Sequence, residues 1–206
     1  SRVEGYAKEL HDKWGVEIVP DIKTLCEKVD AILLESVDGR IHLAHSIILS
    51  TGGVPLIYLG DEIGQLNDYA YLDDPDHAID SRWVNRPRYP AAKYAERDDP
   101  ATDTGLVYQG LRRLIEVRGS TPELAGGTLL GFGTNNPHVL GYQRPGASAT
   151  VLVLANFDDT MQTVTAETLS GFETDAVELT RAQPVSLASG LALRPHEFAW
   201  LRVHLR

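Results

Sequence analysis

The stretch Val54-Pro55-Leu56-Ile57-Tyr58-Leu59-Gly60-Asp61-Glu62 decides which fold the sequence predicts. Its first six residues are apolar on both faces, which is typical of a strand that is covered on both sides, as in a β/α barrel. Pro55 stands near the start of the run, where a sheet tolerates proline best. Asp61 and Glu62 follow at the carboxyl end, where barrel enzymes place their sites. The stretch therefore predicts a barrel strand with two acidic residues at its mouth.

The segment after this strand predicts a long functional loop. Residues 60–103 have weak periodicity and many Asp, Tyr, Pro and Arg residues, among them the cluster Asp80-Ser81-Arg82-Trp83. An ordered loop of this length in a compact domain usually has a function. Helical order returns at Thr104, and apolar residues then recur on one stripe up to Val117.

Residues 126–206 predict an antiparallel β-sandwich, because short strand-like runs alternate with turn signals such as Asn135-Asn136-Pro137 and Arg144-Pro145-Gly146. The strand candidates are Thr128–Phe132, His138–Gln143, Thr150–Asn156, Gln162–Ala166, Asp175–Glu178, Val185–Leu187, Leu191–Leu193 and Phe198–Val203.

The first 45 residues have a different rhythm of helix, strand, helix and strand, which indicates half of a doubly wound α/β unit. The predicted fold class is therefore α/β plus all-β, with partial β/α fragments followed by the sandwich. Three segments are expected: a partial Rossmann-like fragment at 1–45, a barrel unit with its long loop at 46–125, and the sandwich at 126–206.

Composition excludes several classes of partner. The net charge is −10 and acidic residues are scattered, so the chain has no basic face for nucleic acid. The longest apolar runs are too short to span a bilayer, so no membrane partner is expected. The single cysteine, Cys26, cannot form an intramolecular disulfide and fits a reducing, cytoplasmic compartment.

Four motifs together resemble the end of an amylosucrase, a member of the alpha-amylase superfamily. They are STGGVPLIYLGDEIGQLNDY (50–69), DSRWVNRPRY (80–89), DPATDTGLVYQGLRRLIEVR (99–118) and NPHVLGY (136–142). GGVPLIYLGDE alone is typical only of the superfamily, in which it is the last strand of the TIM-type barrel. LGDEIGQLNDY combined with DSRW is more specific. The resemblance covers Ser46 to Arg206.

The resemblance implies roles for five residues of a sugar-binding site. Arg82, in DSRW, matches an arginine that closes the bottom of the glucosyl pocket by pairing with an acidic residue on an earlier loop. Its motif neighbours Asp80 and Trp83 belong to the same site, and Trp83 either stacks on a sugar or packs under the loop. Asp61 and Glu62 are expected to support the site rather than to carry out chemistry.

The implied activity is retaining transfer of the glucosyl unit of sucrose to an α-glucan. Such transfer needs a nucleophilic carboxylate and an acid/base carboxylate about 5 Å apart. In the family these come from middle strands of the barrel, and a barrel needs roughly 250 residues. We therefore expect no catalytic residue in this chain. No cofactor is expected, and no metal, because Asp73, Asp74, Asp76 and Asp80 lack the ligand pattern of a calcium loop.

Two alternatives stay open. The first is a non-catalytic carbohydrate-binding accessory module, in which loop aromatics and the sandwich hold glucan weakly. Residues 15–42 resemble a nucleotide-domain fragment of the Gfo/Idh/MocA oxidoreductases, but the glycine-rich phosphate loop of that family is absent from the sequence. Two unrelated parts that meet at residues 37–46 predict a chimera, from a misassembled gene product or, alternatively, a true fusion.

Overall fold

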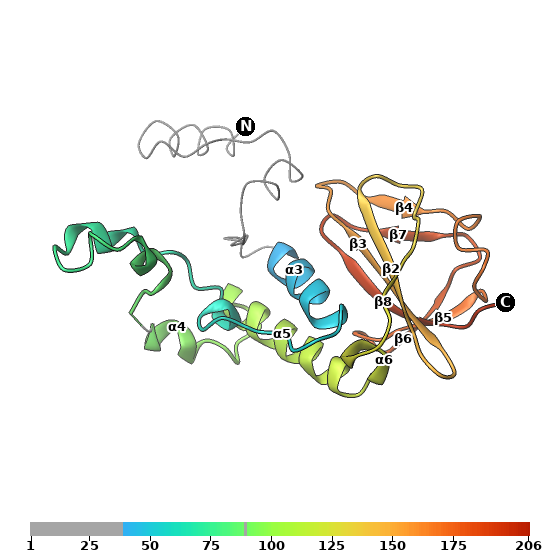
Figure 1. Ribbon diagram of the computed structural model, residues 1–206, viewed down its shortest axis with the longest axis horizontal. Helices are drawn as coiled ribbons and strands as arrows, with labels where there is room; N and C mark the ends of the chain where they lie inside the picture. The colour runs from blue at the N-terminus through green and yellow to red at the C-terminus, as the bar shows by residue number, and fades with distance from the viewer. Residues whose placement is uncertain (1–38, 89) are drawn as a thin grey trace. The chain divides into compact units, whose positions relative to one another are not determined.

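The computed structural model describes residues 39–88 and 90–206 (Figure 1). Residues 15–38 of the oxidoreductase-like stretch, Cys26 among them, lie outside the described residues, and its last four residues belong to α3 (Gly39–Ser50). Helical elements come first and strands follow. The helical elements are α3 (Gly39–Ser50), the 3₁₀ helices η1 (Asp61–Ile63), η2 (Tyr69–Asp73) and η3 (Ser81–Asn85), and then α4 (Ala91–Ala95), α5 (Asp103–Gly119) and α6 (Pro122–Ala125).

The strands form two antiparallel sheets, as the sequence predicts for the C-terminal region. The strands are β1 (Leu130–Gly131), β2 (Val139–Pro145), β3 (Thr150–Asn156), β4 (Gln162–Val164), β5 (Asp175–Glu178), β6 (Gln183–Ser186), β7 (Leu191–Leu193) and β8 (Phe198–Val203). The larger sheet has six strands in the order β1-β2-β3-β8-β5-β6, and the smaller one pairs β4 with β7. The bounds of β3, β5, β7 and β8 are those predicted from the sequence.

β3 lies at the centre of the core, and all seven of its residues are buried. Val153 lies opposite Trp200 of β8, and both belong to the core on the helical side. Leu152 lies opposite Leu201, and both belong to the core on the side of the small sheet. Because alternate residues of a strand face opposite sides of a sheet, β3 is covered by helices on one face and by β4 and β7 on the other.

α5 supplies most of the helical cover. Its N-cap is Thr102, whose Oγ1 accepts a hydrogen bond from Gly105 N at 3.0 Å. Val107, Leu111 and Leu114 recur at helical spacing and are buried against the sheet together with Leu49 of α3. The apolar stripe predicted for this helix is therefore the face that packs. Figure 1 shows α3 and α5 on the same side of the large sheet.

Two arginines hold the turn after α3 and helix α6. Arg118 Nη1 donates to Leu124 O at 2.7 Å, and its Nη2 donates to Gly53 O at 2.8 Å. Arg144, on β2, is 1% exposed and donates to the carbonyls of Thr51, Glu123 and Gly126. Main-chain carbonyls that no helix or strand satisfies thereby gain donors.

The predicted barrel strand at 54–59 is not formed. Residues 54–58 have no regular secondary structure and pair with no strand among the described residues. Pro55 and Ile57 are half-buried near α5, whereas Val54 and Leu56 are 98% and 78% exposed. A parallel strand needs neighbours on its edges and cover on both faces, and the described strands all pair antiparallel elsewhere.

The predicted segment boundary at residue 45 falls inside α3, which is continuous from Gly39 to Ser50. The compact unit to which α3 belongs begins at Glu35. Whether two parental sequences meet at 37–46 stays a prediction. No helix in the described parts of the chain combines the length and apolarity needed to cross a membrane.

Candidate functional site

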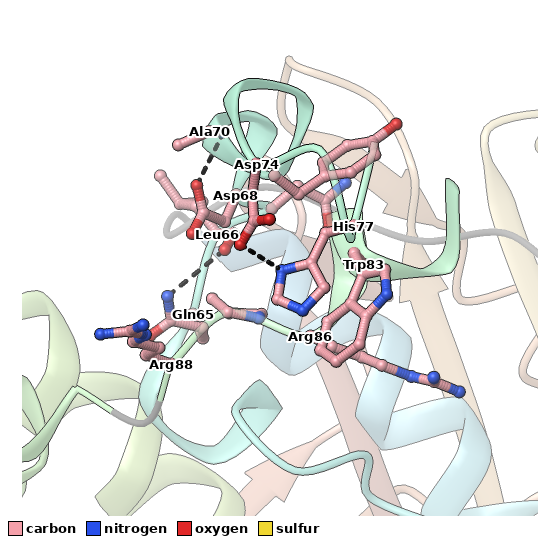
Figure 2. A pocket seen from close by; sticks show the side chains of 12 residues that line it. Gln65, Leu66, Asp68, Ala70, Asp74, His77, Trp83, Arg86 and Arg88 are labelled. Carbon is pink, nitrogen blue, oxygen red and sulfur yellow. Dashed lines mark hydrogen bonds and ion pairs between the residues drawn. The ribbon is translucent and has the colours of Figure 1, made fainter. Parts of the chain in front are cut away.

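A cavity of about 590 Å³ lies in the loop between η1 and α4 (Figure 2). Its walls combine aromatic, amide and charged side chains. The lining residues are Gln65, Leu66, Asn67, Asp68, Ala70, Tyr71, Asp74, His77, Trp83, Arg86, Pro87 and Arg88. The volume lies in the range typical of sites for small molecules.

Aspartates at turn starts shape the walls of this cavity. Asp68 caps η2 by accepting from Ala70 N at 2.9 Å, and Asp80 caps η3 by accepting from Arg82 N at 3.0 Å. Asp74 accepts from Asp76 N at 3.0 Å in the same way. Asp68 N also donates to Val84 O at 2.9 Å, which joins the two arms of the loop. These three aspartates thus cap short helices and turns.

His77 and Trp83 form a stacked pair at the cavity. Their ring centroids are 3.8 Å apart and the rings are inclined by 28°. His77 Nδ1 lies 3.1 Å from Asp74 Oδ2, the contact marked by a dashed line in Figure 2. Both rings are half-buried. The histidine is therefore fixed on one side by a carboxylate and on the other by the indole.

Arg82 pairs with Asp80 at the surface beside the cavity. Nε donates to Asp80 Oδ1 at 2.8 Å and Nη2 donates to Oδ2 at 2.7 Å, which is a bidentate contact. Hydrogen bonds from Arg82 lower the pKa of Asp80 to about 2. The Arg82 side chain is 72% exposed and does not line the cavity. Its carboxylate partner here is a neighbour in sequence, whereas the resemblance implies a residue on an earlier loop.

Asp61 and Glu62 build the turn that leads into the loop. Glu62 Oε2 accepts from Gly60 N at 2.7 Å, and Asp61 Oδ2 accepts from Tyr58 N at 3.2 Å. Asp61 Oδ2 also lies 3.7 Å from His45 Nε2. Gly60 and Gly64 flank η1 with φ of 106° and 59°, a conformation that favours glycine. Neither acidic residue lines the cavity.

Of the five residues predicted for the site, the structure places only Trp83 on the cavity wall. The sequence analysis missed His77, Asp74, Gln65, Arg86 and Arg88. One signal was available: Asp68, Asp74 and Asp80 recur every six residues in a segment without helical periodicity, and aspartate favours the first position of turns. In the described ranges, no three or more His, Cys, Asp or Glu side chains come together in a way that would hold a metal ion.

No protein-family model matches the sequence. Glucosylglycerate phosphorylase of Escherichia coli strain K12 is 31% identical over 167 residues, covering 80% of this chain and 28% of the relative. Alpha-amylase 3 of Dictyoglomus thermophilum is 26% identical over 136 residues, covering 60% of this chain and 26% of the relative. The chain thus spans less than a third of the length of these curated relatives.

Solved structures match the fold across most of the chain. Trehalulose synthase MutB from Pseudomonas mesoacidophila MX-45 has a TM-score of 0.59 and 20% identity, covering 81% of this chain and 38% of the synthase. AmyP in complex with maltose has a TM-score of 0.57 and 19% identity, covering 80% of this chain and 34% of AmyP. The homologues and structural neighbours are enzymes of the alpha-amylase superfamily.

The part of the chain that matches these enzymes includes its antiparallel C-terminal sheets. Some of the superfamily structures hold sugars: MutB variants were solved with the substrate sucrose and with glucose. Amylosucrase itself is not distinguished from other members of the superfamily by these comparisons.

Proposed function

We propose that this chain carries the C-terminal portion of an amylosucrase-like enzyme, which transfers the glucosyl unit of sucrose to an α-glucan with retention of configuration. The observation that carries the proposal is the bidentate contact between Arg82 and Asp80 on the loop that follows the LGDE motif, because it holds the arginine of the DSRW motif in one orientation. The superfamily of the relatives, and a neighbour solved with sucrose, support the same substrate class.

In this proposal Arg82 contributes to the floor of the glucosyl pocket. Asp80 engages Nε and Nη2, so the guanidinium is held in one orientation while Nη1 remains for a second acceptor. That acceptor is a sugar hydroxyl or a carboxylate from another part of the complete enzyme. A planar guanidinium suits this role, because its donors have fixed directions.

The two carboxylates of a retaining mechanism are not assigned to this chain. They must lie about 5 Å apart on either side of the scissile bond. Asp68, Asp74 and Asp80 are engaged as caps, and Asp61 and Glu62 hold a turn. We infer that the chain supplies binding groups, and that the chemistry belongs to other segments of the enzyme.

A carbohydrate-binding accessory module is the second candidate function. The sandwich with its covering helices forms two cores around β3, and the cavity offers a stacked aromatic pair. Such a module would bind glucan without a preference for sucrose. The oxidoreductase alternative rests mainly on residues 15–38, which lie outside the described ranges.

Binding of sucrose to wild type and to an Arg82→Ala variant tests the proposal. We expect sucrose to shift the Arg82 Nε–H resonance, and Arg82→Ala to weaken sucrose binding about tenfold, because a hydrogen bond from a charged donor is worth about 1.5 kcal/mol or more. Arg112→Ala is the matched control, since Arg112 is equally exposed and pairs with Glu116 on α5. Equal affinity in all three proteins would contradict the proposal, and binding of maltotriose but not of sucrose would favour the accessory module.

A further inference from the structure

The cavity and Arg82 are two separate features of the same loop, because Arg82 pairs with Asp80 at the surface and is not a lining residue. We propose that the cavity is a second subsite, which takes one neutral hexopyranosyl unit of the α-glucan and stacks it on the His77–Trp83 pair. The identity of the glucan rests on the proposed function. The stacking and the neutrality of the ligand rest on the cavity alone.

The His77–Trp83 pair is fixed before any ligand binds. Trp83 belongs to η3, whose first turn is capped by Asp80. His77 is held by the 3.1 Å contact with Asp74, whose other carboxylate oxygen accepts from Asp76 N. An aromatic surface that is already ordered costs little conformational entropy when a ligand binds. The apolar C–H face of a pyranose ring is the natural partner of such a surface.

The charges around the cavity favour a neutral ligand. Two acidic residues, Asp68 and Asp74, and two basic residues, Arg86 and Arg88, are among those that line the cavity, so the formal charges of the lining residues balance. Both hydrogen-bond donors and acceptors are therefore at hand, as the hydroxyl groups of a sugar require. An anion such as phosphate would meet two carboxylates as well as two arginines.

Gln65 lines the cavity, but its side-chain oxygen is closed off from a ligand. Its Oε1 is buried and has no partner among the described residues, while Nε2 makes only a 3.4 Å bond to Leu66 O. A buried acceptor that lacks a donor costs free energy. Because this oxygen has less than 1 Å² of accessible surface, a sugar hydroxyl in the cavity does not reach it, and the subsite does not depend on it.

The test is a nuclear magnetic resonance titration of the full chain with maltotriose, sucrose and inorganic phosphate, following the Trp83 indole N–H. The variants are Trp83→Ala, Trp83→Phe and Arg82→Ala. Ile79→Ala is the matched control, because Ile79 lies on the same loop, is 90% exposed and does not line the cavity. We expect maltotriose to shift the indole resonance of wild type, Arg82→Ala and Ile79→Ala. The affinity of every protein, including the two Trp83 variants, is measured by titration calorimetry, and Trp83→Ala should weaken maltotriose binding at least fivefold. Trp83→Phe, which keeps an aromatic ring, should weaken it less, and Ile79→Ala should not change it.

The outcomes separate this inference from the proposed function. If Arg82→Ala abolishes the response to sucrose but leaves the maltotriose shift at Trp83, both stand. If sucrose does not bind while maltotriose still shifts Trp83, the proposed function fails and the subsite stands. The subsite is overturned if Trp83→Phe and Trp83→Ala bind maltotriose as wild type does, if maltotriose leaves the Trp83 indole unmoved, or if phosphate shifts it at lower concentration than maltotriose.

Discussion

Arg144 shows how a single charged side chain can hold several segments together. It is almost fully buried, and its three acceptors are carbonyl oxygens of Thr51, Glu123 and Gly126. These carbonyls belong to the turn after α3 and to the two ends of α6. A buried guanidinium is tolerated here because hydrogen bonds replace the water that it loses.

Arg144→Ala should lower the free energy of unfolding by about 2–4 kcal/mol, because the buried carbonyls lose their donor and a cavity remains. Arg112→Ala, which removes an exposed ion pair on α5, should cost less than about 0.5 kcal/mol. Urea unfolding of the two variants measures the difference. A similar decrease in the free energy of unfolding in both variants would show that the hydrogen bonds of Arg144 do not stabilise these segments.

His45 predicts a pH dependence of stability. Its Nδ1 lies 2.9 Å from Ile41 O, which can only accept, so Nδ1 carries a proton and Nε2 faces Asp61. Burial opposes the charged form, but the contacts with Asp61 and the Ile41 carbonyl outweigh it and raise the pKa of His45 above 6.5. The folded state then holds the proton more tightly than the unfolded state.

The contribution of His45 should be present in full below pH 6.5 and be lost as the pH rises through the raised pKa of the folded state. Unfolding free energies of wild type and Asp61→Asn, measured from pH 5.5 to 8.5, test this. Wild type should lose more stability than the variant over that range. Burial lowers the pKa of the nearby His42, but this effect is shared by both proteins. Parallel curves would rule out the His45–Asp61 contact.

The sequence predicted the loop that contains the cavity, but it did not predict most of the residues that line the cavity. The DSRW motif led to Trp83, which does line the cavity. His77 was missed because its partners, Asp74 and Trp83, lie three and six residues away along an irregular backbone. No fixed period relates such contacts to the sequence, so only the fold of the loop reveals them.

Among the elements, α5 depends on close contact at its first turn. An added Cβ at Gly105 would lie 1.9 Å from Asp99 O, a backbone atom that cannot move aside alone. Gly119, at the other end of the same helix, has no atom within 4 Å of that position.

Gly105→Ala should therefore destabilise the protein by about 1–3 kcal/mol, although alanine is the better helix former. Gly119→Ala should leave the stability unchanged or raise it by less than about 1 kcal/mol. Thermal unfolding monitored by circular dichroism at 222 nm compares them. A gain of stability in Gly105→Ala would show that the turn before α5 is looser than described.

Antiparallel strands and the amphipathic helix were predicted well, and the expected parallel strand was not. α5 and the strands of the sandwich have periodic apolar residues and nearby turns, whether a strand pairs with the next one, as β2 does with β3, or with a distant one, as β3 does with β8. Residues 54–59 have an equally clear apolar pattern, but a parallel strand also requires neighbours, and the described residues provide none. Val54 and Leu56 are exposed because no neighbouring strand or helix covers them among the described residues.

For the whole molecule, the packing predicts how a protease will divide the chain. Loop residues 66–88 are mostly exposed or half-buried, whereas Ile41 and Leu49 of α3 share a core with Leu111 and Trp200. We expect the first cuts within the described residues to fall at 66–99. The two pieces should stay together on a native size-exclusion column and separate on a denaturing gel. Separation of α3 from the sandwich under native conditions would contradict this packing.

We propose that the chain binds sucrose, and that the catalytic carboxylates belong to other segments of the complete enzyme. Equilibrium dialysis of the full chain against sucrose labelled in the glucosyl unit, followed by chromatography of the retained label, reports binding and turnover together. We expect that label is retained, that all of it is intact sucrose, and that no fructose is released above a buffer control. Absence of retained label, or fructose release that survives a second purification, would contradict it.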